Sequence, residues 1–594
     1  MLTVNRFQFI VCVFAAVLAG SLQMAALQKH APPVNEPAKS DPAFDSVVDK
    51  IAAREAQFVK DLADYYPIVE TYIQNMRADR DLGRVPISDQ YFLGRMRLET
   101  GVQDIDFLGS HEPGTLGRMF EAMNQFVHLN SSQSKFIPAG FAQMIIMDMS
   151  TFDRQHYDFK LVRREFLGEV RTLVIDVQPK RSKSKASKAM FIGRIWVEDQ
   201  QYNVVRFNGT FTPNPPHGEY LHFDSWRFNM GGNGQWLPAY VYSEETDLTR
   251  GKDKWDYRAQ TLLWGYYMSR PHKNSEFTDI VVESPDKVKD QSASKHDLTT
   301  VEAERAWKRQ AEDNILDRLQ KGALLAPEGE ADKVLNTVVQ NIEITNKLDN
   351  IEPEIRCRIL LTQPMESFTV GNTIVISRGL LDALPDEASL AAFIAREMGH
   401  ILSAHDVNEK YAFSDALMFP DEAAIGRIKL KRSPQEEEEA NEKGLALLQN
   451  SPYKDKLSSA SLFFAAVKEE SPLLPKLLQG HFGNSVNSTD SGVRMSGLLA
   501  SAAQLQVRDV NQIAALPLGG RIKLDPWSNQ LTIQKSHPVR LLSAHEKMPF
   551  EITPRFPYLT RQSATVEPSS GTALSPEPAP PKPESMPNDR SPQE

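Results

Sequence analysis

The chain has only two cysteines among its 594 residues, Cys12 and Cys357. Cys12 lies in an apolar stretch near the N-terminus, so removal of that stretch would leave Cys357 as the only thiol. An intrachain disulfide is therefore excluded in the processed chain. The stretch Ile355–Leu360 alternates as a strand does, and we expect Cys357 within it to be a buried structural thiol.

The sequence also lacks an excess of positive charge. Its formal net charge is −10, which argues against nucleic acid as the main partner. We find no glycine-rich phosphate loop and no solenoid repeat. These absences argue against nucleic-acid-binding, P-loop and repeat proteins.

Apolar runs long enough to span a bilayer comfortably are missing as well. The run Phe9–Leu18 is too short for that, follows Arg6 without any acidic residue, and precedes the small residues Ala19-Gly20-Ser21. This pattern predicts a secretory signal peptide and an exported protein, either periplasmic or secreted. The alternative is an uncleaved signal that anchors the chain to the inner membrane.

Composition shifts divide the rest of the chain into several predicted segments. The segments are a signal peptide (1–26), a linker (27–43), a helix plus antiparallel-sheet domain (44–270), a linker (271–298), a mainly helical domain (299–515), a small β annex (516–562) and a disordered Pro-rich tail (563–594). The predicted fold class is α+β and multidomain.

The first domain is predicted to begin with a helix over Phe44–Met76 and to continue as strands from Phe136 to Met268. Several antiparallel strands with aromatic faces predict a curved sheet closed by helices. This layout is similar to the half-barrels of bacterial lipoprotein carriers such as LolA. The domain is therefore either a binder of a lipid or acyl chain or an ordinary packed sheet. Lys180–Lys188 is a basic loop that either contacts anionic headgroups or is simply solvated.

The second domain contains the sequence Arg396-Glu397-Met398-Gly399-His400. Residues four apart project from nearly the same side of a helix, which in H-E-x-x-H aims two imidazoles at one Zn²⁺. Here the first imidazole is replaced by the guanidinium of Arg396, which offers no lone pair to a metal. Apolar residues at helical spacing indicate that His400 faces the protein interior.

A second helix is predicted about forty residues later. Ser433 and Glu436 form a capping box with Pro434 at the first helical position. Glu437 begins the core-facing stripe of this helix, where a carboxylate requires a cation. His405 lies five residues after His400, which on a continuing helix is about 140° away, so we expect a surface or helix-end histidine.

Residues from about Leu324 to Tyr453 resemble the metallopeptidase family of the HtpX heat-shock protease and the CAAX prenyl protease. The resemblance rests on Ser367–Leu381, the segment Leu384–Ala388, the motif at Arg396–His400, and Glu437 with Ala440-Asn441. It implies a mainly helical gluzincin-type domain with a small edge sheet, a zinc cofactor and polypeptide substrates.

The resemblance also implies roles for particular residues. Glu397 falls on the catalytic glutamate, and His400 and Glu437 on two metal ligands, while Arg396 occupies the first ligand position. Asn441 stands where the family usually has an aspartate that orients the ligands. The strand carrying Thr373, Ile374 and Val375 would lie beside the cleft and pair with an extended peptide.

Two hypotheses remain for function. The first is a pseudopeptidase that binds extended or misfolded envelope polypeptides without cutting them, with zinc weak or absent. The second is an active zinc metalloendopeptidase in protein quality control, with Glu397 as general base. Under the first hypothesis, we expect Arg396 to reach into the metal position and pair with Glu437 or Glu397.

Overall fold

The computed structural model of the chain divides into two compact units, and each is described by itself. The described residues are 42–79, 83–97, 104–107, 141, 144–167, 170–180, 189–214, 220–230, 235–250, 253–266, 300–348, 351–384, 386–407, 412–413, 428, 430–486, 495–499, 522–524 and 531–533. The predicted signal peptide, the linker at 271–298 and the tail at 563–594 lie outside the described residues. None of the described helices is long and apolar enough to cross a membrane.

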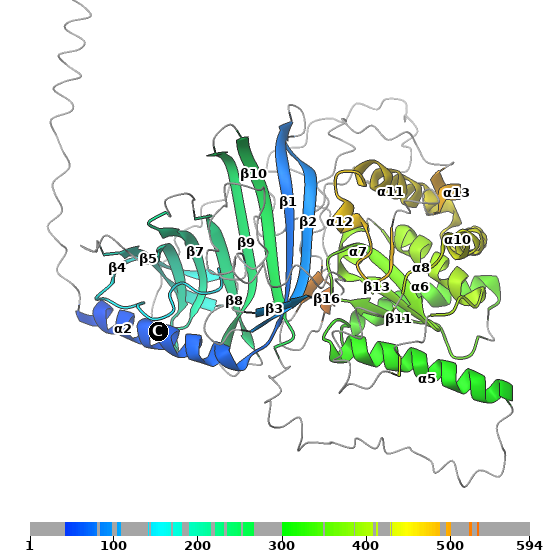
Figure 1. The fold of residues 1–594 in the computed structure, drawn as a ribbon, viewed down its shortest axis with the longest axis horizontal. Coiled ribbons are helices and arrows are strands. Elements are labelled where there is room, and N and C mark those ends of the chain that lie inside the picture. Colours follow the sequence, from blue (N-terminus) through cyan, green and yellow to red (C-terminus); the bar gives the residue numbers. More distant parts are fainter. Residues whose placement is uncertain are drawn as a thin grey trace, which may run out of the picture. The chain divides into compact units, whose positions relative to one another are not determined.

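The first unit comprises residues 1–61 and 146–213. Helix α2 (Pro42–Asp61) opens it, and its strands are β4 (Tyr157–Leu167), β5 (Val170–Pro179), β6 (Met190–Glu198) and β7 (Val204–Thr212), in the antiparallel order β7-β6-β5-β4 (Figure 1). Strands β6 and β7 approach closely where Gly193 pairs with Gly209, and the ring of Phe191 lies over this pair. A Cβ on either glycine would meet backbone atoms within 3 Å, so only glycine fits there.

The second unit comprises residues 62–145 and 214–594, and its first part continues as antiparallel strands. A short 3₁₀ helix (Leu62–Asp64) precedes β1 (Ile68–Asp79), β2 (Gly83–Arg97) and β3 (Asp104–Phe107), and β8 (Phe223–Met230), β9 (Gln235–Arg250) and β10 (Asp253–Trp264) follow. Their order is β3-β2-β1-β10-β9-β8. Strands β4 to β10 fall within the region Phe136–Met268, where strands were predicted, whereas β1, β2 and β3 precede it.

The predicted helix over Phe44–Met76 is wrong in its second half. Helix α2 ends at Asp61, and β1 begins at Ile68. Pro67 disfavours helical backbone at the residue before it, and β-branched residues are frequent immediately after it. Pairing of β1 with both β2 and β10 then buries these side chains in the sheet.

The remainder of the second unit is mainly helical with a small sheet. It contains α5 (Thr300–Lys321), α6 (Glu330–Asn346), β11 (Arg356–Leu360), β12 (Glu366–Val370), β13 (Thr373–Ser377), α7 (Arg378–Ala383), α8 (Glu387–Leu402), α10 (Pro434–Gln449), a 3₁₀ turn (Lys454–Lys456), α11 (Leu457–Glu470), α12 (Pro475–Leu478), β14 (Asn484–Ser485), α13 (Ser496–Leu499), β15 (Ile522–Leu524) and β16 (Leu531–Ile533). The order of the mixed sheet is β11-β13-β12-β14, with only β11 and β13 parallel among its pairs.

This arrangement confirms the predicted α+β class, an antiparallel sheet followed by a mainly helical region with a small sheet. Helix α5 opens the region predicted to be mainly helical, and the strand expected to carry Thr373, Ile374 and Val375 is β13. Cys357 lies in β11 and is 1% exposed, as expected for a structural thiol. Of the predicted β annex, the hairpin of β15 and β16 is described, whereas Phe550–Thr560 lies outside the described residues.

Within the second unit, buried polar contacts join strands β1 and β2 to the helical region. Glu70 of β1 forms an ion pair of 2.9 Å with Arg378 of α7, and both side chains are buried. Asp89 of β2 accepts the backbone N–H groups of Lys476 and Leu477 at 3.0 and 2.7 Å. Removing one member of such a buried pair leaves an uncompensated charge, so these contacts fix strand and helix together.

Candidate functional site

Helix α8 carries the motif residues and is buried over most of its length. Asp386 caps its N-terminus by accepting the backbone N–H of Ser389 at 2.8 Å. Arg396, Glu397 and His400 are each only 1% exposed. The helix therefore brings three ionisable side chains into the core, where each needs a partner.

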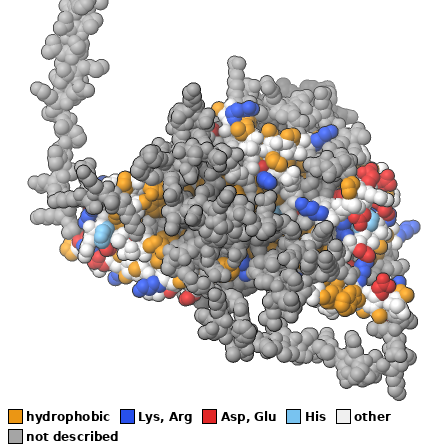
Figure 2. All heavy atoms as spheres, viewed as in Figure 1, with side chains coloured by type: hydrophobic (Ala, Val, Ile, Leu, Met, Phe, Trp, Pro, Cys, Tyr) orange, Lys and Arg blue, Asp and Glu red, His pale blue; other side chains and the backbone are white. Residues whose placement is uncertain are grey.

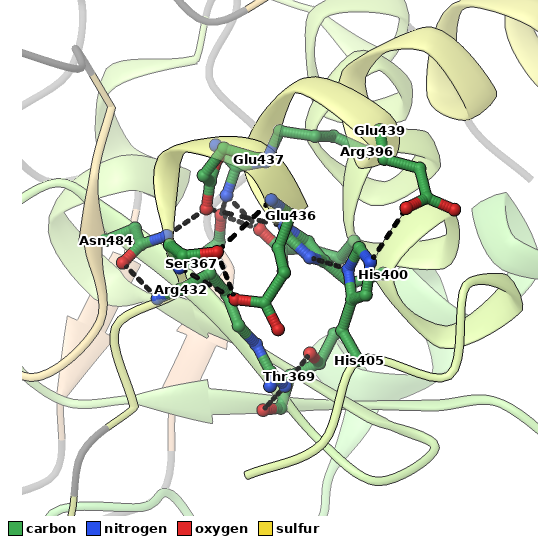
Figure 3. Close-up of polar contacts among 12 residues, drawn as sticks. Ser367, Thr369, Arg396, His400, His405, Arg432, Glu436, Glu437, Glu439 and Asn484 are labelled. Carbon is green, nitrogen blue, oxygen red and sulfur yellow. Dashed lines mark hydrogen bonds and ion pairs between the residues drawn. The ribbon is translucent and has the colours of Figure 1, made fainter. Parts of the chain in front are cut away.

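Arg396 finds its partners within the site itself (Figure 3). Its Nη2 donates to Ser367 Oγ of β12 at 3.1 Å and forms an ion pair with Glu397. Ser367 Oγ in turn donates to Glu397 Oε1 at 2.7 Å. The three side chains form a closed triangle of hydrogen bonds, and the expected pairing of Arg396 is confirmed with Glu397 as the partner.

The pKa directions agree with this geometry. Burial alone would raise the pKa of Glu397, but the charges of Arg396 and His400 hold that pKa below its usual value. Burial disfavours the charged form of Arg396, yet Glu397 and Glu437 raise its pKa above the usual value. Both groups are therefore ionised at neutral pH.

Helix α10 supplies Glu437. The predicted capping box is present, with Ser433 Oγ accepting the backbone N–H of Glu436 at 3.3 Å and the Glu436 carboxylate accepting the backbone N–H of Ser433 at 2.8 Å. Glu437 Oε1 lies 3.4 Å from His400 Nε2 and also accepts a hydrogen bond from the Asn484 side chain. The two predicted ligand residues of the motif and the second helix are thus brought together.

Asn484 was not identified from the sequence. It belongs to β14 and contacts Glu437 through its Nδ2, while its Oδ1 accepts the backbone N–H of Arg432 at 2.7 Å. The segment around it resembles the family only faintly, and the contact joins residues 47 positions apart. A single sequence carries no local signal for such a contact.

His405 lies just beyond the end of α8. Helix α8 ends at Leu402, and Ala404 adopts a left-handed backbone with φ of 53°. The chain therefore turns back, so that His405 Nδ1 lies 2.9 Å from His400 Nδ1. His405 is therefore a helix-end histidine, which was one of the two expected alternatives. The other alternative, a surface histidine, is wrong, because the side chain of His405 is only 8% exposed.

Asn441 lies on α10 one turn after Glu437. Its Oδ1 is buried and has no hydrogen-bond partner among the described residues. The role of orienting ligands that the resemblance implies for this position is therefore not seen for Asn441 in the described part of the chain.

Thr373, Ile374 and Val375 cannot pair with a peptide in this structure. Their strand, β13, pairs with β11 on one side and with β12 on the other, and all three residues are buried. We therefore correct the predicted substrate strand. The strand beside the motif is β12, because Ser367 of that strand contacts both Arg396 and Glu397.

The outer edge of β12 is covered by the protein's own chain. Strand β14 pairs with Glu366 and Ser367, and beyond that point the Nη2 of Arg432 donates to the Thr369 carbonyl oxygen at 3.2 Å and to its hydroxyl at 3.0 Å. One side chain therefore takes the place where an added strand would hydrogen-bond.

Glu366 holds the segment that covers this edge. Its carboxylate accepts the backbone N–H groups of Phe482 and Gly483 at 2.8 and 2.7 Å. The side chain is fully buried, and burial raises its pKa to about 7 despite these hydrogen bonds. Because Asn484 follows directly, Glu366 also sets the position of the residue that contacts Glu437.

The residues present do not fit a zinc ion of the His₂Glu type. Such a site needs three protein ligands around one open position, and the guanidinium at position 396 cannot act as one of them. Among the described residues, no three His, Cys, Asp or Glu side chains gather in a way that could hold a metal ion. The donor set is that of a zinc-peptidase framework with its first ligand replaced by a cation.

The site combines α8 with its R-E-x-x-H sequence, α10 with the facing Glu437, and β12 beside them. This arrangement defines a metallopeptidase-like domain. Residues 364–419 match the model of Peptidase family M48, and this segment is an M48 peptidase family domain. No curated protein matches the chain.

Two solved structures are similar to a part of the chain. A LolA superfamily protein from Nitrosomonas europaea is 13% identical, with 38% of this chain and 97% of that chain covered and a TM-score of 0.18. A putative outer membrane lipoprotein-sorting protein domain from Vibrio parahaemolyticus is 11% identical, with 39% and 95% covered and a TM-score of 0.21. Similarity at this level does not indicate what the chain binds.

Proposed function

We propose that the domain containing residues 364–419, called the M48-like domain below, is a metal-free pseudopeptidase that binds extended segments of other polypeptides without cutting them. The observation that carries the proposal is the buried Arg396, which pairs with Glu397 and Ser367 at the first ligand position. Arg396 supplies the positive charge that the ion would otherwise bring, so the carboxylates of the site are compensated without metal.

An active zinc endopeptidase is the alternative, with Glu397 as the general base. Two features disfavour it. The carboxylate of Glu397 is engaged by Arg396 and Ser367, and its pKa is held below the usual value, which weakens it as a base. Zinc would also have to be held by His400 and Glu437 with a third group that the described residues do not provide.

The proposed binding strand is β12. An extended segment paired with its outer edge would pass directly beside the Arg396–Glu397 pair, because Ser367 lies on this strand. Backbone pairing of this kind gives affinity with little dependence on sequence. The segment would have to displace Arg432 from Thr369, and β14 from Glu366 and Ser367 as well, so binding requires an opening of the edge.

The proposed setting is the bacterial cell envelope. The N-terminal pattern Arg6, Phe9–Leu18 and Ala19-Gly20-Ser21 supports export, and the partners would then be extended or misfolded envelope polypeptides.

The proposal is tested by peptide binding and cleavage assayed together. We expect purified protein to bind an unfolded model polypeptide such as reduced, alkylated α-lactalbumin and to leave it intact. Arg432→Ala, which frees the edge of β12 at Thr369, should bind more tightly, whereas the exposed-site control Arg305→Ala should bind as wild type does. Cleavage by wild-type protein that disappears in Glu397→Gln would instead establish the active endopeptidase.

A further inference from the structure

Strand β4 of the first unit exposes an unusual amount of apolar surface. It is the last strand in the sheet order, and none of the described strands pairs with its outer edge. Leu161 is 42%, Val162 39% and Phe166 67% exposed, within six consecutive residues. Bulky apolar side chains that cluster in this way mark an interaction surface more often than isolated ones do.

Two charged residues of β4 form no ion pair within the described part of the chain, and both are cations. Asp158 lies 3.6 Å from Lys180, and Arg163 lies 2.6 Å from Glu165, so these charges are paired. Lys160 and Arg164 are exposed and form no ion pair with the described carboxylates. At the left of Figure 2, hydrophobic, basic and acidic side chains are interspersed.

The backbone of β4 argues against an added strand as the occupant. The register with β5 shifts between Leu161 and Arg163, which leaves Val162 as a β-bulge in the middle of the strand. A bulge interrupts the regular hydrogen-bond ladder that a pairing strand needs, and charged side chains at an edge discourage pairing further. A flat, negatively charged surface needs no such ladder.

We propose that the β4 edge, defined as Lys160, Leu161, Val162, Arg164 and Phe166, binds the surface of an anionic lipid bilayer. The apolar side chains enter the boundary between headgroups and acyl chains, and the two cations contact the anionic headgroups. Because β4 is an edge strand, side chains from both faces of the sheet can contact a flat surface that lies against its outer edge. The inference is independent of the function proposed for the M48-like domain.

The test is co-sedimentation of the full-length protein with phosphatidylcholine vesicles that contain or lack phosphatidylglycerol. We expect binding only to the anionic vesicles, with a loss as salt is added. Each basic residue near an anionic surface contributes about a fivefold gain in partitioning. Lys160→Gln/Arg164→Gln should therefore reduce partitioning by about 25-fold, and Phe166→Ser should reduce it independently of salt.

Matched controls lie on the helices of the other unit. Ile344 is 68% exposed, like Phe166, so Ile344→Ser should leave partitioning unchanged. Arg305→Gln/Lys333→Gln removes two exposed cations elsewhere and should have a much smaller effect than the β4 pair. Circular dichroism spectra equal to that of wild type would show that each variant is folded.

Three outcomes would overturn the proposal. One is partitioning that is equal for wild type and both β4 variants. Another is equal binding to vesicles with and without phosphatidylglycerol. The third is a wild-type dimer that Phe166→Ser converts to monomer in sedimentation equilibrium, since the β4 edge would then be a contact between copies of the chain.

Discussion

Replacing Arg396 with alanine should destabilise the region around α8 strongly. The substitution leaves the Glu397 carboxyl group 1% exposed and without its cation, with the Ser367 hydroxyl still donating to it. Breaking a buried ion pair by removing one partner costs about 3–5 kcal/mol. A free-energy change of about 1.4 kcal/mol alters an equilibrium constant tenfold. The protection of the α8 amides against hydrogen exchange should therefore fall by roughly two to three and a half orders of magnitude.

Hydrogen exchange of the α8 amides measures this effect without assuming that the whole chain unfolds in two states. Arg305→Ala on an exposed face of α5 serves as the control and should change stability by less than about 0.5 kcal/mol. Adding Glu397→Gln to Arg396→Ala should recover part of the loss, because the unpaired buried charge is then removed. Unchanged α8 protection in Arg396→Ala, or no recovery in the double variant, would refute the compensation argument.

Three further predictions concern other parts of the chain. Because the pKa of Glu366 is raised from 4.5 to about 7, the folded chain keeps a proton in this window that the unfolded chain has lost, so stability falls as pH rises. We expect the free energy of unfolding, measured with urea, to fall by about 3 kcal/mol between pH 4.5 and about pH 7. This fall should be absent in Glu366→Gln, and an equal fall in that variant would contradict the assignment. Mass spectrometry of the native N-terminus should show processing after the apolar run, and an intact Met1 on a cytoplasmic protein would exclude export. If the first domain binds acyl chains, organic extraction of purified protein should release lipid, whereas a lipid-free preparation that takes up no fluorescent fatty acid would leave the packed-sheet alternative.

The parts of the fold that local sequence determines were predictable. The capping box at Ser433 and Glu436 places the start of α10, and the alternation around Cys357 gives a buried strand. Likewise, the R-E-x-x-H spacing on an apolar helix places Arg396, Glu397 and His400 in the core. In each case the signal lies within a few residues, where capping and periodicity act.

Features that depend on contacts far apart in the chain were not predictable. The position of His405 depends on one left-handed residue, Ala404, which ends a helix whose pattern gave no stop signal. The contact of Asn484 with Glu437 and the pairing of both edges of β13 depend on which strands become neighbours. Strand order is a tertiary property that periodicity in one segment cannot supply.

The zinc content of protein purified without added metal tests the central claim most directly. Mass spectrometry should find far less than one zinc per wild-type chain, because a guanidinium stands at the first ligand position. Arg396→His, measured in parallel, should bind more zinc than wild type, although Asn441 in place of an acid keeps that affinity low. One tightly held zinc per wild-type chain would contradict the account.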